Sequence, residues 1–341
     1  MEKLKIGIIG TGHLGKLHVK MFKRISECEV TGIYDSNSQT AKNVAQEFNT
    51  KAFDNLDDLL NEIQAASIAV STTAHHLIAK KCLEKGIHIF VEKPITVSIS
   101  EAEELVQISS DRKLNLQVGH IERFNPAIIS LEKLIFEPMF IQTDRLAQFS
   151  PRGSDVTVVL DLMIHDIDII LNLIKSEVKN IEANGVAVVS DNLDIANARI
   201  EFENGAVANV TASRISQKKM RKMRIFQRDA YISLDFITGV SEVYRLLPID
   251  QYSDPTTMSF GEIGIGEKKK RLIYEQPEIK DVNALKYELE LFVKSIIYKT
   301  NPVVSGMDGL RALKVAEIIM NKIEGSQKKL IESLNNFNSG L

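Results

Sequence analysis

A glycine-rich turn near the start of the chain constrains its fold more than any other feature. The run Gly10-Thr11-Gly12-His13-Leu14-Gly15 directly follows the apolar stretch Leu4–Gly10 and leads into the helical pattern His13–Arg24. In such a strand–turn–helix, the first glycine allows the tight turn, the second lets the backbone approach a pyrophosphate, and the third allows close packing of helix on strand. The N–H groups at the start of the helix also favour bound phosphate. The sequence therefore predicts that residues 10–15 bind a dinucleotide.

An acidic residue stands at the distance that such a turn requires. Asp35 lies about 20 residues after Gly15 and closes the strand pattern Glu29–Asp35. A carboxylate there hydrogen-bonds the ribose hydroxyls and repels a 2′-phosphate. The next residues, Ser36 and Asn37, bring no arginine. We therefore expect the cofactor to be NAD in preference to NADP.

Up to about residue 120 the chain alternates short apolar strand patterns with helical patterns. This alternation predicts a parallel sheet covered by helices on both faces. Together with the glycine-rich turn, it predicts an α/β, doubly wound Rossmann domain over residues 1–120. The expected strands are Leu4–Gly10, Glu29–Asp35, Ser67–Ser71, Ile87–Val91 and Leu114–Val118, and the expected helices are His13–Arg24, Ser38–Phe48, Leu56–Ile63, His75–Lys85 and Ile99–Ser110.

After residue 120 strands follow one another without intervening helices. Strand patterns run from about residue 180 to 246, and Asn204-Gly205 between two of them is a strong hairpin signal. Residues 121–341 are therefore expected to form a substrate-binding and oligomerisation domain of α+β type, with a large, mostly antiparallel, open-faced sheet. The expected helices are Pro126–Ile135, Val156–Ile174, Val282–Tyr298 and Met307–Ile323, and the polar, glycine-containing residues 248–270 predict a long loop.

Length and composition set the broad class of the protein. A chain of 341 residues that is 44% hydrophobic and 26% charged is expected to form two globular domains. Its net charge of −3 gives no general attraction to nucleic acid, and no apolar run reaches the ~20 residues of a membrane helix. We expect a cytoplasmic protein, because the first residues lack a signal-peptide pattern and Cys28 and Cys82 make no disulfide framework. No metal ligands are assigned.

A lysine stands where the fourth expected strand ends. Glu92-Lys93-Pro94 follows Ile87–Val91, and ligands of open α/β sheets bind beyond the carboxyl ends of the strands. Beside a bound nicotinamide, an amine is partly desolvated and close to a cationic ring, and both effects ease the loss of its proton. Lys93 is thus a candidate proton acceptor; the alternative is a solvated lysine before a loop proline. The neighbouring strand ends also place Ser71, Thr72, His75 and Glu92 at the cofactor.

A second candidate pair lies in the helical pattern Val156–Ile174. Asp161 and His165 are four residues apart and so share one face of a helix, where a carboxylate and an imidazole suit a sugar-like hydroxyl. The alternative is a buried pair whose members satisfy each other. Asp166 and Asp168, in the same apolar stretch, indicate either a polar cleft or hydrogen bonds to nearby backbone.

Taken together, these motifs resemble the Gfo/Idh/MocA family over nearly the whole chain. The segment Ser305–Ala312 also looks like the entry of the family's closing helix. The resemblance implies hydride transfer between NAD(P) and a ring carbon of a sugar, cyclitol or similar polyol. It further implies that Lys93 and His165 handle the proton and that Asp161 is their substrate-binding partner.

Two segments resemble more narrowly the branch of the family that includes UDP-N-acetylglucosamine 3-dehydrogenases. They are Val118–Pro126 and Asp161–Asp168. The branch implies oxidation of the C3 hydroxyl of a nucleotide sugar to a ketone. We accordingly assign His120, Arg123, Asn125 and Arg152 to substrate binding, with Lys93, Asp161 and His165.

A basic segment offers a site for the diphosphate of such a substrate. Lysines and arginines crowd residues 214–224, and Arg145 and Arg152 precede the helix with Asp161. Arginine forks match phosphate oxygens, so some of these side chains are candidates for a diphosphate clamp. Alternatively, the segment is a basic edge strand that discourages aggregation.

The sequence leaves two alternative functions open and also bears on the oligomeric state. An inositol, another polyol or a free aldose is an alternative substrate, and a non-catalytic dinucleotide sensor is an alternative class, because fold alone does not establish function. The family resemblance further implies that the open face of the second sheet pairs with another subunit. We therefore expect a homodimer or a homotetramer.

Overall fold

The computed structural model describes residues 2–150, 156–251 and 258–338, and the side chains of the last helix up to Gln327. Two compact units divide the chain. The first contains Met1–Phe124 and Val282–Lys314, and the second contains Asn125–Asp281 and Val315–Leu341. The first unit thus receives a segment that follows the whole of the second sheet in the sequence.

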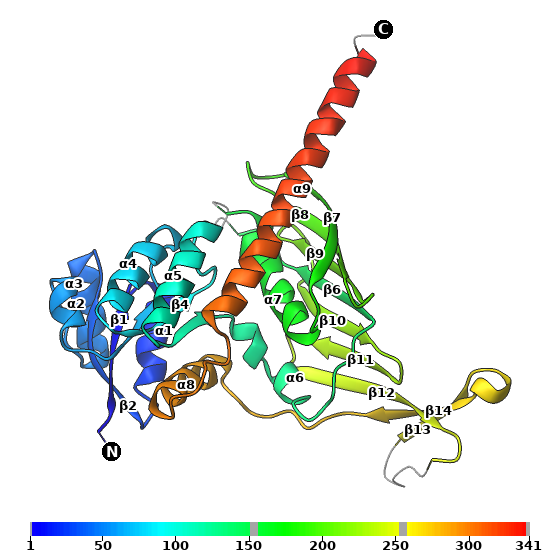
Figure 1. Ribbon diagram of the computed structural model, residues 1–341, viewed down its shortest axis with the longest axis horizontal. Coiled ribbons are helices and arrows are strands. Elements are labelled where there is room, and N and C mark those ends of the chain that lie inside the picture. Colours follow the sequence, from blue (N-terminus) through cyan, green and yellow to red (C-terminus); the bar gives the residue numbers. More distant parts are fainter. Residues whose placement is uncertain (1, 151–155, 252–257, 339–341) are drawn as a thin grey trace. The chain divides into compact units, whose positions relative to one another are not determined.

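The first unit is built on a parallel sheet of five strands in the order β2-β1-β3-β4-β5 (Figure 1). Because β2 and β3 lie on opposite sides of β1, the strand order reverses between β1 and β3, which is where ligands of such sheets bind. The predicted doubly wound sheet is confirmed. Its strands are β1 (Leu4–Ile9), β2 (Cys28–Tyr34), β3 (Ala65–Ile68), β4 (His88–Glu92) and β5 (Leu116–Gly119), and its helices are α1 (His13–Phe22), α2 (Ser38–Phe48), α3 (Leu56–Leu60), α4 (Thr72–Glu84), α5 (Ile99–Asp111), the short 3-10 helix η1 (Ile121–Phe124) and α8 (Ala284–Ile297).

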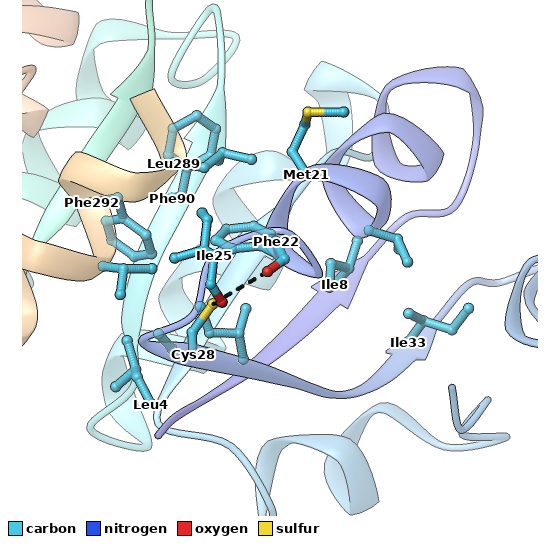
Figure 2. Packing of buried hydrophobic residues seen from close by; sticks show 14 of the residues in the cluster. Leu4, Ile8, Met21, Phe22, Ile25, Cys28, Ile33, Phe90, Leu289 and Phe292 are labelled. Carbon is cyan, nitrogen blue, oxygen red and sulfur yellow. Dashed lines mark hydrogen bonds between the residues drawn. The ribbon is translucent and has the colours of Figure 1, made fainter. Parts of the chain in front are cut away.

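The core of this unit includes residues from both of its segments. Ile6 and Ile8 of β1 are fully buried, as expected for a strand covered on both faces. Figure 2 shows Phe22 of α1 in one apolar cluster with Leu289 and Phe292 of α8. The α8 helix is therefore part of the core and not an appendage.

The second unit is built on a sheet of nine strands in the order β13-β14-β12-β11-β10-β6-β9-β8-β7. Only β6 and β9 pair in parallel among the strands described, so the sheet is mostly antiparallel, as predicted. The strands are β6 (Phe140–Leu146), β7 (Val178–Val186), β8 (Ile195–Phe202), β9 (Val207–Ser213), β10 (Met220–Phe226), β11 (Ala230–Asp235), β12 (Val240–Pro248), β13 (Met258–Ile263) and β14 (Lys270–Glu275). The helical elements are α6 (Pro126–Ile129), the π-helical turn η2 (Val159–Met163), α7 (Ile164–Leu173), the 3-10 turn η3 (Gly266–Lys268) and α9 (Gly306–Asn338), of which residues 306–314 belong to the first unit.

The two faces of this sheet differ in burial. Along β6, Ile141, Thr143 and Arg145 are buried, whereas the alternate residues are only half-buried. The buried face packs on α7, and Ile323 of α9 lies within reach of Gly185 in β7. The other face, with residues such as Gln142 and Asp144 of β6, is the open face of the sheet.

Several local predictions are wrong. The loop expected over residues 248–270 contains β13, an exposed edge strand that pairs with β14 despite the glycine within it. The helix expected over Pro126–Ile135 ends after Ile129, beyond which the Ser130 hydroxyl lies 2.7 Å from that of Ser241. Strand β6 lay outside the run of expected strands. None of the helices within the described ranges has the length and hydrophobicity that a membrane crossing requires.

Candidate active site

The glycine-rich turn has three glycines in three different surroundings. Gly10 has a φ of +87°, and a Cβ there would lie 2.7 Å from the Ala69 carbonyl oxygen. A Cβ on Gly15 would lie 1.8 Å from the carbonyl oxygen of Gly10, so the helix start packs directly on the turn. By contrast, a Cβ on Gly12 would meet nothing within 4 Å. The turn is therefore tight at its first and third glycines and open at the second.

This open position coincides with the start of α1. Gly12 is the residue before the helix and provides no side-chain cap, and no acidic residue stands in the first turn. His13 and Leu14 are exposed there, Leu14 by 43%. An uncapped helix start with space in front of it suits the pyrophosphate of a dinucleotide.

Asp35 lies directly after β2 and beside this turn. Its carboxylate accepts hydrogen bonds from Thr11 and from the backbone N–H of Asn37. Because the carboxylate is half-buried and held at the edge of the open turn, these residues fit an NAD adenosine ribose as well as its pyrophosphate. Beyond β3, Ser71 precedes α4 without capping it and Thr72 opens that helix, so both stand at the carboxyl edge of the sheet.

The tripeptide Glu92-Lys93-Pro94 also lies at this edge. Glu92 is the last residue of β4, and Lys93 beyond it is half-buried. Burial acts to raise the pKa of Glu92, but the hydrogen bond and charge of His18, with lesser contributions from Lys93 and His75, hold that pKa below the usual glutamate value. Glu92 is therefore a half-buried carboxylate that stays charged, directly before the candidate proton acceptor.

His75 was assigned to the cofactor, and the structure shows its contacts within the first unit. The side chain is 1% exposed, and its Nδ1 lies 2.9 Å from the Pro94 carbonyl oxygen. Burial lowers the pKa of His75, against the opposing effect of hydrogen bonds to the carbonyls of Pro94 and Val70. A neutral imidazole donates one hydrogen bond, which the shorter distance assigns to Pro94.

Asp161 and His165 lie on consecutive helical elements of the second unit. Asp161 belongs to the π-helical turn η2, in which the N–H of Ile164 bonds to the carbonyl of Val159, five residues back. His165 is in the first turn of α7, and both side chains are half-buried. The predicted helix is present, but its first turn is wider than an α-helical turn, and such π-turns occur frequently at functional sites.

The remaining substrate candidates have different surroundings. His120 is 1% exposed, and a guanidinium nitrogen of Arg123 lies 3.6 Å from Asp308 within the first unit. Asn125 caps α6 through Ala127 and donates to the carbonyl of Phe236 within the second unit. Arg152 lies outside the described residues.

The arginines proposed for a diphosphate clamp are largely engaged inside the second unit. Arg145 binds Asp166 through two nitrogens at 2.9 and 2.8 Å, and both side chains are 3% exposed. Arg214 is 4% exposed and donates to the carbonyls of Val156 and Leu193. Both are therefore structural residues. The exposed part of the basic segment comprises Lys218, Lys219, Arg221 and Lys222.

His18 is a buried polar residue of the first unit that the sequence did not single out. His18 on α1 is fully buried, with its Nδ1 2.7 Å from the Ser67 hydroxyl and its Nε2 3.0 Å from Glu92. A histidine three residues after Gly15, between Leu17 and Val19 on an apolar helix, was the available signal. The identity of its partners depends on strands β3 and β4, far away in the sequence.

Comparisons with known proteins match both units. The model of the Gfo/Idh/MocA oxidoreductase family, NAD-binding Rossmann fold, matches residues 4–120. The model of the Gfo/Idh/MocA C-terminal domain matches residues 142–233. The first match agrees with the open glycine turn, and the second covers the centre of the nine-stranded sheet.

Individual relatives extend the match to nearly the whole chain. UDP-N-acetylglucosamine 3-dehydrogenase of Acidithiobacillus ferrooxidans is 40% identical over 246 residues, which are 72% of this chain and 78% of the relative. The solved structure of that enzyme matches with a TM-score of 0.84 and 34% identity, over 95% of this chain and 99% of the other. Myo-inositol 2-dehydrogenase of Thermotoga maritima is 22% identical over 97% of this chain and 99% of its own length. This chain therefore belongs to the Gfo/Idh/MocA family of oxidoreductases and has an NAD-binding Rossmann domain.

Proposed function

We propose that this protein is an NAD-dependent dehydrogenase that oxidises the C3 hydroxyl of a nucleotide sugar, with UDP-N-acetylglucosamine as the expected substrate. The observation that carries the proposal is the similarity, in sequence and over 95% of the chain in structure, to a UDP-N-acetylglucosamine 3-dehydrogenase. The segments Val118–Pro126 and Asp161–Asp168 carry the same resemblance in the residues proposed for the site.

The choice of NAD over NADP rests on Asp35. Its carboxylate lies beside the open glycine turn and is held there by Thr11 and Asn37. A fixed negative charge binds the two ribose hydroxyls of NAD and repels a 2′-phosphate. The start of α1 at Gly12 holds the pyrophosphate. When bound, the nicotinamide supplies the hydride acceptor of the reaction.

Protein side chains must then remove the proton of the hydroxyl that is oxidised. We assign this step to Lys93 and His165: one accepts the proton, and the other orients the hydroxyl or passes the proton on. A cationic Lys93 also stabilises negative charge that develops on the substrate oxygen. Asp161, in the turn before His165, orients substrate hydroxyls as a hydrogen-bond acceptor.

The experiment that tests this function follows NADH absorbance after the protein is mixed with NAD and one candidate substrate at a time. We expect turnover with UDP-N-acetylglucosamine, retained when the sugar is changed only away from C3 and lost with the 3-deoxy analogue. Turnover with myo-inositol but not with the nucleotide sugar would replace the proposal by the polyol alternative, which the relative from Thermotoga maritima supports. Absence of turnover with both classes would contradict both.

We further propose that the open face of the nine-stranded sheet binds a second copy of the chain. Six aromatic side chains form a continuous row across six neighbouring strands of this sheet, with ring centroids 4.9–6.3 Å apart. Phe226 and Phe260 in this aromatic row are 40% and 57% exposed. Exposed aromatic surface of this kind is typical of subunit interfaces. The row consists of Phe140, Phe226, Tyr231, Tyr244, Tyr274 and Phe260.

A further inference from the structure

Two buried histidines of the first unit hold the residues on either side of Lys93. His18 comes from α1 and is fully buried. Its Nε2 lies 3.0 Å from Oε1 of Glu92, and its Nδ1 lies 2.7 Å from the hydroxyl oxygen of Ser67. Nε2 thus lies against the Glu92 carboxylate, and the Ser67 contact fixes the plane of the ring. Glu92 is thereby tied to both α1 and β3.

The second histidine acts on the opposite side of the lysine. His75 comes from α4 and is 1% exposed. Its Nδ1 lies 2.9 Å from the carbonyl oxygen of Pro94, and its Nε2 lies 3.3 Å from that of Val70. Pro94 is thus tied to the helix that follows β3. The backbone of Lys93 therefore runs between two anchored neighbours.

Residues of β4 and β5 also surround the Glu92 carboxylate and its histidine. A Cβ on Gly119 of β5 would lie 3.1 Å from both Cδ and Oε2 of Glu92, closer than nearly all real contacts of this kind. The ring of Phe90 meets that of His18 edge to face, with centroids 5.5 Å apart. A side chain larger than glycine at position 119 would therefore press on the Glu92 carboxylate that His18 contacts.

We propose that His18 and His75 are positioning residues that hold Lys93 in place for proton transfer. The proposal rests on the function proposed above, in which Lys93 handles the proton of the substrate hydroxyl. Catalytic geometry is sensitive to small shifts, and a misplacement of about 1 Å costs on the order of 100-fold in rate. Neither histidine needs to touch the substrate or the cofactor for this role.

Paired variants at each histidine separate positioning from general stability. His75→Leu removes the donor to Pro94, whereas His75→Asn keeps an amide nitrogen where Nδ1 stands. His18→Leu removes the ring nitrogen that contacts Glu92, whereas His18→Gln keeps an amide nitrogen where Nε2 stands. The matched control is His76→Leu, because His76 is the next residue on α4 and pairs at the surface with Glu104. Ser67→Ala tests the His18 contact if His18→Leu does not fold.

The measurements are kcat with the sugar that gives turnover, the dissociation constant of NAD, and thermal unfolding. For each leucine variant we expect kcat to fall by about 10- to 100-fold while NAD binding changes little. His75→Asn and His18→Gln should recover most of the wild-type kcat, and His76→Leu should keep the wild-type kcat. A leucine variant that is folded and keeps the wild-type kcat overturns the inference. If His18→Leu does not fold, wild-type turnover in Ser67→Ala overturns the part of the inference that concerns His18.

A second comparison uses a background that lacks the lysine. If the histidines act through Lys93, adding His75→Leu to Lys93→Ala lowers the residual turnover no further. The effects of two substitutions on turnover do not add when one residue acts through the other. A full additional loss contradicts the inference. Wild-type turnover in Lys93→Ala would exclude Lys93 from proton handling and overturn this inference with it. The proposed function fails separately, if the wild-type protein does not oxidise the nucleotide sugar.

Discussion

Oδ2 of Asp35 accepts two hydrogen bonds from Thr11, one from the backbone N–H at 2.7 Å and one from the hydroxyl at 2.9 Å. Oδ1 accepts a third bond, from the N–H of Asn37 at 2.9 Å. The carboxylate at the end of β2 is therefore tied to the glycine-rich turn itself. Its charge cannot swing away from an approaching 2′-phosphate without breaking these bonds.

Asp35→Ala is expected to weaken NAD binding and to reduce the preference of the protein for NAD over NADP. Hydrogen bonds to a charged group contribute about 1.5–3 kcal/mol each, so loss of the ribose contacts raises the dissociation constant of NAD by tenfold or more. Removal of the negative charge lowers the dissociation constant of NADP. Titration of both cofactors by nicotinamide fluorescence, with the reduced forms, measures the ratio.

Asp54→Ala is the matched control, since the Asp54 side chain is 79% exposed and pairs only loosely with Lys42, at 3.5 Å. It should leave both dissociation constants unchanged. An Asp35→Ala protein with the wild-type ratio of NAD to NADP affinity would remove the basis for the proposed cofactor preference.

Lys93→Ala and His165→Ala are each expected to lower kcat by about 10²–10⁴-fold, the contribution of a positioned acid or base. Both variants should still bind NAD, because the contacts proposed for the cofactor, at the turn at Gly12 and at Asp35, are unchanged. Stopped-flow NADH formation measures the chemical step, and equilibrium titration measures cofactor binding. Near-normal turnover in either variant would exclude that residue from proton handling.

Arg145→Met is expected to destabilise the second unit without any role in diphosphate binding. Arg145 and Asp166 form a bidentate pair in which each side chain is 3% exposed. Arg145→Met leaves the buried Asp166 carboxylate without its guanidinium, and breaking such a buried pair costs about 3–5 kcal/mol. Urea unfolding measures the loss. Arg224→Met, which breaks a partly exposed pair with Asp144 on the same sheet, should cost less than about 1 kcal/mol. Equal losses in the two variants would contradict the structural role of Arg145.

Phe226→Asp is expected to dissociate the proposed dimer. Phe226 lies within the aromatic row on the open face of the sheet and is 40% exposed. A charge there faces the second copy across an interface that should bury more than about 1,000 Å². Light scattering after size exclusion gives the mass of each species. Tyr298→Asp, an aromatic residue of the first unit that is 66% exposed, is the control and should leave the mass unchanged.

Asp194 is expected to make the second unit sensitive to acid. Burial acts to raise the pKa of Asp194, but the N–H groups of Val189, Val188 and Ser190 and the Ser190 hydroxyl lower it from 3.8 to about 2. Since the folded pKa lies below the unfolded value, the charged carboxylate stabilises the fold above about pH 4 and that contribution is lost as the pH falls towards 2.

Asp194→Asn should therefore be less stable than the wild type at neutral pH, and the difference should shrink between pH 4 and 2. Urea unfolding at several pH values measures it. Asp191→Asn, an exposed aspartate on the same loop, is the control. A stability difference that stays constant over this range would contradict the assignment to the Asp194 charge.

The sequence predicted most of the first unit because its signals are local. The glycines at 10, 12 and 15 and the acid at 35 need only their neighbours in the chain to be interpreted, and the buried strands are continuous apolar runs. The second sheet was correctly predicted to be mostly antiparallel, but strands such as β6 and β13 were not predicted. In strand β13 the alternation of apolar and polar residues stops after Met258-Ser259-Phe260, where the register with β14 shifts, so the pattern is too short to reveal the strand.

The roles of the charged residues could not be predicted in the same way. Arg145 and Arg214 look like candidate phosphate ligands in the sequence, yet Asp166 and Asp194 bind them inside the second unit. Likewise His18 has partners on β3 and β4 that only the folded sheet brings near it. A charge pattern shows that partners are needed but not whether they are substrate or protein.

The return of residues 282–314 to the first unit has a consequence for the synthesis of the protein. The apolar cluster around Phe22 is completed by Leu289 and Phe292, which leave the ribosome only after the entire second sheet has been translated. Until then the nascent Rossmann unit exposes apolar surface of the kind that favours aggregation or chaperone binding. A premature stop codon shortly before Ala284 would spare the glycine-rich turn and all five parallel strands, yet it should still abolish NAD binding.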